Sequence, residues 1–180
     1  MSAREQLLRI LAENSFRLGD FQLSSGGRSD YYVDCRSTTL DALGASLTAR
    51  VVLDEIRRRG WAPEAIGGMT LGADPVVAAV AMLSAQESQS HAAQGEECGG
   101  ALIHGFLVRK AEKAHGTGQR IEGFRRKGAR VVIVDDVCTT GASTVQAIEA
   151  AREAGFQVVG VLCLVEREEE IGRASCRERV

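Results

Sequence analysis

The sequence lacks any apolar run long enough to cross a bilayer, which takes about 20 residues. Its first residues also lack the apolar core of a secretory signal peptide. An excess of one charge is missing as well, because 22 Lys and Arg accompany 24 Asp and Glu. This balance speaks against a nucleic-acid binder and against attraction to a membrane surface. We therefore predict a cytoplasmic protein with neither nucleic acid nor membrane as a partner.

Several chemistry-bearing motifs are also missing. The chain has no G-x-x-x-x-G-K-[ST] loop and no G-x-G-x-x-G fingerprint, which argues against P-loop NTPases and Rossmann dehydrogenases. Its five cysteines are odd in number, scattered, and form no C-x-x-C pair. Disulfide frameworks and zinc sites are therefore disfavoured, and reduced, mostly inert thiols are favoured. These cysteines are Cys35, Cys98, Cys138, Cys163 and Cys176.

What is present is a repeated order of strand, small-residue loop and helix. A short strand at 65–68 precedes a loop, after which Asp74 is the expected N-cap of an apolar helix that runs to about Ala85. A buried strand at 131–134 leads through a turn into a helix at 144–154. This alternation predicts an α/β fold with a doubly wound, mostly parallel sheet flanked by helices. With 180 residues, 44% of them hydrophobic, the chain can bury one core.

The first forty residues or so are expected to be an accessory to this sheet, because they resemble one helix followed by a small hairpin. Further along, one segment rich in Gln, Ser and Glu shows no periodicity and predicts an exposed loop. Another is basic, contains Gly, and predicts a long flexible loop. The expected elements are helices at 2–14 and 40–59, strands at 16–23, 31–34, 101–108 and 157–165, and loops at 84–100 and 109–118.

The last ten residues, 171–180, do not continue the alternation of strands and helices. They resemble the translation of a sequencing-adapter sequence. We therefore interpret 170–180 as a non-native tail and the natural chain as truncated near Glu169. The expected single domain then covers residues 1–169, with a hood formed by about 1–40.

The strand at 131–134 ends in two carboxylates, Asp135 and Asp136, and a turn of Thr, Gly and Ser follows them into a helix. In open α/β sheets, ligands bind beyond the carboxyl ends of the strands. Backbone N–H groups at a helix N-terminus, with neighbouring hydroxyls, suit a phosphate. Carboxylates accept hydrogen bonds from sugar hydroxyls. The stretch therefore predicts a site for a ribose that carries a 5-phosphate.

A hydrophobic strand, two acids and then T-T/A-G-x-[ST] resembles the hallmark of the type I phosphoribosyltransferases. Other stretches are similar to one branch of that family, the orotate phosphoribosyltransferases. They are Phe21-x-Leu-Ser-Ser-Gly26, Ser29-x-Tyr-Tyr-x-Asp34, Thr70-Leu-Gly-Ala-Asp-Pro75 and Val108-Arg-Lys-x-x-Lys-x-His-Gly-Thr-Gly118. The resemblance covers about residues 1–169 and implies the type I phosphoribosyltransferase fold with its N-terminal hood.

The resemblance implies transfer of ribose 5-phosphate from phosphoribosyl pyrophosphate (PRPP) to orotate, with Mg²⁺ held mainly through PRPP and no direct protein ligand. It also implies a homodimer in which the basic loop closes over the neighbouring subunit's site. Lys113, His115, Asp135 and Asp136 would be catalytic. Orotate would be bound by Thr139, Arg167, Tyr31 and Tyr32. PRPP would be bound by Arg109, Lys110, Lys113, His115, Asp135, Asp136, Val137, Cys138, Thr139, Thr140, Gly141, Ala142 and Ser143.

The chain departs from the family pattern at three places. The polar segment 86–100 is longer than expected, Ala142 stands where a second Gly is frequent, and Gly72 stands where some members carry Lys. Two alternatives stay open. One is a phosphoribosyltransferase for a purine or uracil. The other is a PRPP-sensing regulator without catalysis, which should lack the loop's Lys and His and carry a DNA-binding segment.

Overall fold

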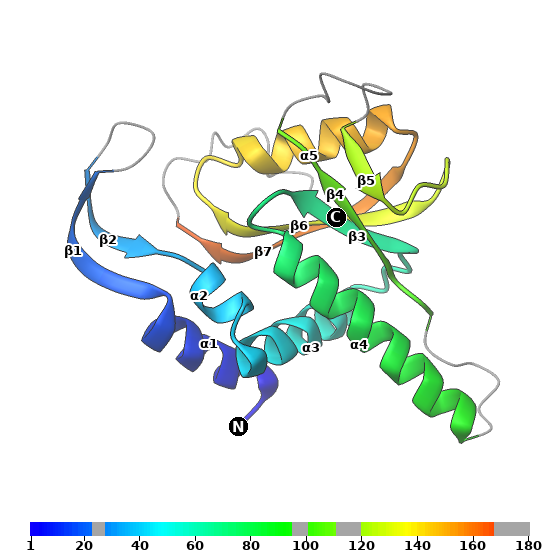
Figure 1. Ribbon diagram of the computed structural model, residues 1–180, viewed down its shortest axis with the longest axis horizontal. Helices are drawn as coiled ribbons and strands as arrows, with labels where there is room; N and C mark the ends of the chain where they lie inside the picture. Colours follow the sequence, from blue (N-terminus) through cyan, green and yellow to red (C-terminus); the bar gives the residue numbers. More distant parts are fainter. Residues whose placement is uncertain (23–27, 95–100, 111–119, 168–180) are drawn as a thin grey trace.

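The computed structural model describes residues 1–22, 28–94, 101–110 and 120–167 (Figure 1). Within them, a five-stranded sheet has the order β5-β4-β3-β6-β7, and a two-stranded hairpin lies apart from it. The sheet consists of β3 (Ala65–Met69), β4 (His104–Val108), β5 (Ile121–Gly123), β6 (Arg130–Cys138) and β7 (Gln157–Glu166). The helices are α1 (Ala3–Asn14), α2 (Arg36–Thr39), α3 (Ala42–Arg58), α4 (Asp74–Ala93) and α5 (Ala142–Glu153).

Four strands of the sheet are parallel, and only the edge strand β5 is antiparallel to its neighbour β4. After β3 the chain passes through α4 to β4 on one side, whereas after β6 it passes through α5 to β7 on the other. The strand order therefore reverses between β3 and β6. The predicted mostly parallel α/β sheet is confirmed, and its switch point coincides with the strand that ends in the acid pair.

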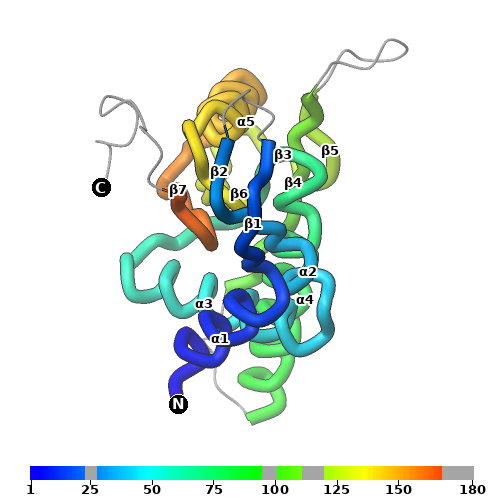
Figure 2. Tube along the Cα trace, turned by 90° about the vertical axis from the view of Figure 1, so that its left-hand side faces the viewer, coloured from blue at the N-terminus to red at the C-terminus, as the bar shows by residue number. Residues whose placement is uncertain are grey.

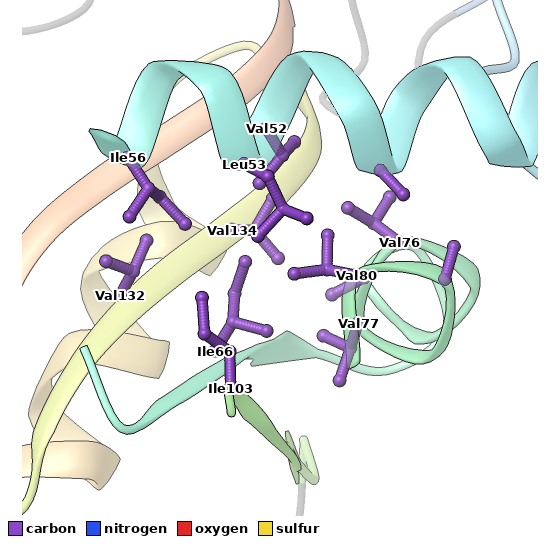
Figure 3. Packing of buried hydrophobic residues seen from close by; sticks show 13 residues of the cluster. Val52, Leu53, Ile56, Ile66, Val76, Val77, Val80, Ile103, Val132 and Val134 are labelled. Carbon is purple, nitrogen blue, oxygen red and sulfur yellow. The ribbon is translucent and has the colours of Figure 1, made fainter. Parts of the chain in front are cut away.

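Helices cover both faces of the sheet. On one face, α3 and α4 pack Leu53, Val76 and Val80 against Ile66 of β3 and Val134 of β6 (Figure 3). On the other face of the sheet, the alanines of α5 pack against the same two strands, beside an aromatic cluster around Phe106 and Phe156. The central strand β6 is thus buried on both sides, which explains its continuous apolar run. The alanines of α5 are Ala147, Ala150 and Ala151.

The N-terminal residues form the expected hood. Helix α1 begins with a capping box, in which the Ser2 hydroxyl accepts from the Glu5 N–H and the Glu5 carboxylate accepts from the Ser2 N–H. The antiparallel strands β1 (Phe16–Gln22) and β2 (Arg28–Val33) follow it. Leu7 and Leu11 of α1 pack with Cys35, and Val165 of β7 lies against this cluster. The hairpin therefore stands beside the carboxyl ends of β6 and β7 (Figures 1 and 2).

The prediction of a loop at 84–100 was wrong for residues 84–93, because α4 continues to Ala93. Polar contacts hold this extension in place. The Ser84 hydroxyl is buried and accepts from the Ile103 N–H at 3.1 Å, and the Glu87 carboxylate forms ion pairs with Arg50 and Arg57 of α3. Residues 95–100 lie outside the described part of the chain. Among the described residues, no helix is long and apolar enough to span a membrane.

Other boundaries differ from the predictions by a few residues. Asp74 is the first residue of α4 instead of its N-cap, which is Ala73. The helix predicted at 40–59 is α3, which Asp41 caps by accepting from the Gly44 N–H, whereas the short helix α2 before it was not predicted. The strand expected at 101–108 begins only at His104, and the three-residue β5 was not predicted. The predicted tail at 170–180 lies beyond the described residues.

Candidate active site

Asp135 ties the carboxyl end of β6 to the first turn of α5. Its side chain is buried, with 5% of its surface exposed. Oδ2 accepts hydrogen bonds from the Ser143 hydroxyl at 2.8 Å and from the Thr144 hydroxyl at 2.7 Å. The two hydroxyls compensate for the loss of water around a buried carboxylate. The Ser143 hydroxyl, predicted to bind phosphate, is thus engaged by Asp135, and Thr144 is a site residue that the sequence analysis missed.

Asp136 has different surroundings. Its Oδ1 accepts from the N–H of Val137 at 2.9 Å, and partial burial raises the pKa of its carboxyl, with the charge of Asp135 adding to the rise. The loop between β3 and α4 approaches it so closely that a Cβ on Gly72 would lie 2.2 Å from Oδ1. The loop's backbone therefore packs against Asp136, as expected at a switch point. Within that loop, the peptide bond between Thr70 and Leu71 is cis.

The turn after β6 has the geometry of an anion cradle. Gly141 has a φ of +76°, in the left-handed region that favours glycine, and directly precedes α5. The Ala142 N–H reaches the Thr140 Oγ1 at 3.4 Å. The N–H groups of this helix N-terminus lie in the same turn as the hydroxyls of Thr139 and Thr140, a combination of donors that suits an anion. Ala142 fits here as the first helical residue, so the absence of a second glycine does not prevent the helix from forming.

The basic loop begins and ends on a pair of neighbouring strands. Arg109 follows β4, and its backbone N–H donates to the Arg120 carbonyl at 2.9 Å just before β5. The Arg109 side chain forms an ion pair with Glu122 of β5, with Nη1 2.8 Å from Oε1. Lys110 is the last described residue before the gap. The predicted site residues Lys113 and His115 lie outside the described residues.

Arg167 and Tyr31 meet where the hood contacts the end of β7. The Arg167 guanidinium lies 4.5 Å from the centre of the Tyr31 ring, and its Nη2 donates to the Ser29 hydroxyl at 2.9 Å. The predicted orotate residues Tyr31 and Arg167 are therefore brought together. Tyr32, the next residue of β2, instead packs its ring against Phe21 at 5.5 Å. Successive strand residues point to opposite faces, so the two tyrosines are separated.

Two cysteines near the site, Cys35 and Cys138, are buried. Cys35 is fully buried, and burial raises the pKa of its thiol to about 12, with the charges of Asp136 and Asp34 adding to the effect. Its Sγ donates to the Asp136 carbonyl at 3.6 Å. Cys138, at the end of β6, is buried as well. Because the thiolate is the nucleophilic form, Cys35 is a packing residue in this site.

Comparison with known proteins places this geometry in a family. The model of the phosphoribosyl transferase domain matches residues 74–176. Orotate phosphoribosyltransferase of Streptomyces avermitilis is 44% identical over 164 residues, covering 91% of this chain and 82% of the relative. That of Aquifex aeolicus is 39% identical over 172 residues, covering 94% and 86%.

A solved structure agrees with these relatives. Mycobacterium tuberculosis orotate phosphoribosyltransferase in complex with 5-phospho-α-D-ribosyl 1-diphosphate superimposes with a TM-score of 0.71 and 32% sequence identity. The match covers 96% of this chain and 88% of that one. The similarity in fold and sequence thus extends over nearly the whole chain. The chain belongs to the type I phosphoribosyltransferase family, among its orotate phosphoribosyltransferases.

Proposed function

We propose that the protein transfers the ribose 5-phosphate of PRPP to orotate, giving orotidine 5′-monophosphate and pyrophosphate in pyrimidine biosynthesis. The observation that carries the proposal is the acid pair at the end of β6, followed at once by the Thr-Thr-Gly cradle at the N-terminus of α5. This is a ribose-phosphate site at the strand-order reversal. The relatives named above carry the same activity in their names.

The fixed half of the site binds the ribose phosphate. Asp135 and Asp136 accept from the ribose hydroxyls, and residues 137–143 surround the 5-phosphate. Since the Ser143 hydroxyl is bonded to Asp135, the phosphate is held by backbone N–H groups and by the hydroxyls of Thr139 and Thr140. A single rigid turn thereby positions both ends of the sugar.

The chain contributes to the reaction mainly by electrostatic stabilisation. Departure of pyrophosphate leaves positive charge on the ribose ring, which the carboxylates of Asp135 and Asp136 stabilise. Arg109, Lys110, Lys113 and His115 of the basic loop bind the leaving pyrophosphate. A loop that closes over the site also excludes water, which would otherwise hydrolyse the sugar.

The proposal includes Mg²⁺ as a cofactor. Mg²⁺ in proteins commonly combines one or two carboxylates with substrate phosphates and waters, and the acid pair beside the cradle fits that donor set. Among the described residues, no group of three or more His, Cys, Asp or Glu could hold a metal ion. We propose, as the family resemblance implies, that the ion is held mainly through PRPP. When bound, Mg²⁺ would offset charge on the leaving pyrophosphate. Calorimetric titration with PRPP should give tighter binding with Mg²⁺ than without it.

The proposal also includes a cytoplasmic homodimer whose basic loops act in the neighbouring subunit's site. Support comes from large apolar side chains that the single chain leaves exposed, such as Leu40, Leu43 and Leu71. Exposed apolar surface of this kind is common at subunit interfaces.

An assay with a panel of bases tests the function. The purified protein is incubated with PRPP, with and without Mg²⁺, and with orotate, uracil or hypoxanthine. We expect turnover of orotate, dependent on Mg²⁺, and little turnover of the other two. Turnover of uracil or hypoxanthine without orotate would assign the chain to another phosphoribosyltransferase activity. Binding of PRPP without any turnover would favour a sensing regulator.

A further inference from the structure

The backbone of Arg167 is anchored to the acid-bearing strand. Its N–H donates to the carbonyl of Cys138, the last residue of β6, at 3.0 Å. The side chain therefore starts from a fixed point between the end of β6 and the hood. The direction of the guanidinium then depends on the contacts that this group makes.

Two residues of β2 orient that guanidinium. The Tyr31 ring lies under it at 4.5 Å and fixes the plane of the group, as a cation–π contact does. The Ser29 hydroxyl accepts from Nη2 at 2.9 Å and fixes its direction within that plane. The Tyr31 hydroxyl also reaches back to the Arg167 carbonyl at 3.5 Å.

Ser29 is itself held in place. Its Oγ accepts from the backbone N–H of Tyr31 at 3.3 Å, and its backbone pairs with Phe21 of β1. Tyr31 is supported by the Phe16 ring, stacked at 5.5 Å. The acceptor that Arg167 meets is therefore a fixed point of the hairpin, and not the end of a long, rotatable side chain.

We infer that Ser29 is a positioning residue for Arg167, and that through it the hood sets recognition of the carboxylate on the base. This inference rests on the proposed function, and it takes Arg167, which the family resemblance implies as an orotate-binding residue, to bind the carboxylate of orotate. A guanidinium presents five N–H donors in a rigid plane, and bidentate binding of a carboxylate requires the right in-plane direction. Ser29 supplies that direction without touching the substrate.

A double-mutant cycle tests the role. Ser29→Ala, Arg167→Ala and the double variant are compared with wild type for kcat, KM for orotate and KM for PRPP. We expect Ser29→Ala to raise KM for orotate about tenfold, the effect of one charge-assisted hydrogen bond, and to leave KM for PRPP unchanged. Ser29→Thr, which keeps the hydroxyl, should restore the wild-type value. In the Arg167→Ala background, loss of Ser29 should have no further effect.

A matched control separates positioning from stability of the hairpin. Asp20→Asn removes the ion pair between Asp20 of β1 and Arg28 of β2, in the same hairpin but without contact to Arg167. It should leave KM for orotate unchanged, and thermal unfolding of all variants reports on folding. Three results would overturn the inference. They are an equal rise in KM for orotate in Asp20→Asn and Ser29→Ala, failure of Ser29→Thr to restore the wild-type KM, and additive effects on KM in the double variant.

The proposed function can fail separately from this inference. If wild type does not use orotate, the proposed function fails before any variant is compared. If wild type uses orotate and Ser29→Ala leaves KM for orotate unchanged, only the positioning role of Ser29 is wrong.

Discussion

Asp135 and Asp136 are adjacent in sequence but have different chemical surroundings. Asp135 is buried and receives two hydroxyl hydrogen bonds, so its carboxylate is part of the structure that joins β6 to α5. Asp136 is partly buried, and that burial raises the pKa of its carboxyl. Adjacent carboxylates with unlike environments can take unlike roles. We therefore expect their substitutions to separate folding from catalysis.

Asp135→Asn keeps an oxygen that accepts from Ser143 and Thr144 but removes the negative charge. We expect kcat/KM to fall about 100-fold, because charge stabilisation is lost while the fold is kept. Asp135→Ala leaves both hydroxyls without their acceptor and should in addition lower the free energy of unfolding by about 1–3 kcal/mol. Steady-state kinetics and urea unfolding measure the two effects. Equal stability of the Asn and Ala variants would contradict the structural role.

Asp136→Asn should remove activity but raise stability at neutral pH. Because burial raises the folded-state pKa of Asp136 above its unfolded value, the protonated form favours the fold, and this contribution is lost as pH rises through the folded pKa. An uncharged Asn avoids that loss. We expect the Tm to rise at pH 7 by about 2–4 °C, the shift for ~1 kcal/mol in a chain of this size. The gain should vanish below the unfolded pKa. In wild type, kcat/KM should fall on acidification at a higher pH than for an ordinary aspartate.

Glu55 provides a control of opposite sign. Hydrogen bonds from Arg58 and Arg59 lower the pKa of its carboxyl to about 2. Its ionised form therefore favours the fold above the unfolded pKa, and this contribution is lost as pH falls through the folded pKa. Glu55→Gln, in α3, should lower the Tm slightly at pH 7 because the pairs are exposed. A rise in Tm for both Asp136→Asn and Glu55→Gln would show that the change in net charge, and not the burial of Asp136, causes the rise in Tm.

At the scale of elements, β3 and the loop that follows it approach β6 closely at two glycines, Gly68 in the strand and Gly72 in the loop. A Cβ on Gly72 would meet the Asp136 carboxylate at 2.2 Å, whereas a Cβ on Gly68 would meet the Val134 carbonyl oxygen at 2.0 Å. The Asp136 side chain can rotate away from an added Cβ, whereas the backbone of β6 cannot move in this way. Gly72→Ala should thus lower kcat/KM more than tenfold, or about 1.4 kcal/mol, with little change in Tm. Gly68→Ala should destabilise the fold by about 1–3 kcal/mol. Kinetics and thermal unfolding of both variants test this contrast.

The sequence predicted the elements whose signal is local. The apolar run of β6 and the small-residue turn before α5 were predicted correctly, because burial and turn geometry depend on residues adjacent in the sequence. The end of the strand was not, because β6 continues through Asp135 and Asp136 to Cys138. The second half of α4 was missed because its support is tertiary. Ser84 bonds to Ile103, and Glu87 pairs with Arg50 and Arg57, so no apolar period reveals the helix. Strand β5 was missed because its three residues gain their order from pairing with β4.

The candidate site was predictable in part for the same reason. The ribose-phosphate half is contiguous in the chain, so its residues and chemistry follow from one stretch. The bonds of Ser143 and Thr144 to Asp135 depend on how α5 turns back onto β6, which spacing alone does not give. The contact of Arg167 with Ser29 joins residues 138 positions apart, and only the folded chain brings them together.

At the scale of the whole molecule, the parts of the proposed site come from both sides of the strand-order reversal. The acid pair lies near the end of β6, the cradle follows that strand, and Arg167 follows β7. The basic loop, in contrast, leaves the sheet between β4 and β5, on the other side of β3. At its base, the Arg109 side chain is paired with Glu122 of β5. This separation supports the proposal that each loop serves the neighbouring subunit.

Subunit mixing tests that proposal directly. Lys113→Ala removes a loop cation, and Asp135→Asn damages the ribose site, so each homodimer should be almost inactive. If loops act across subunits, a mixed dimer has one site in which both defects meet and one that is intact. Random pairing of equal amounts makes half of the dimers mixed, so activity should recover to about a quarter of wild type. Mixing Lys113→Ala with His115→Ala, whose defects lie in the same loop, should restore nothing. If loops act within their own subunit, each site of the mixed dimer carries one defect, and the first mixture also stays inactive.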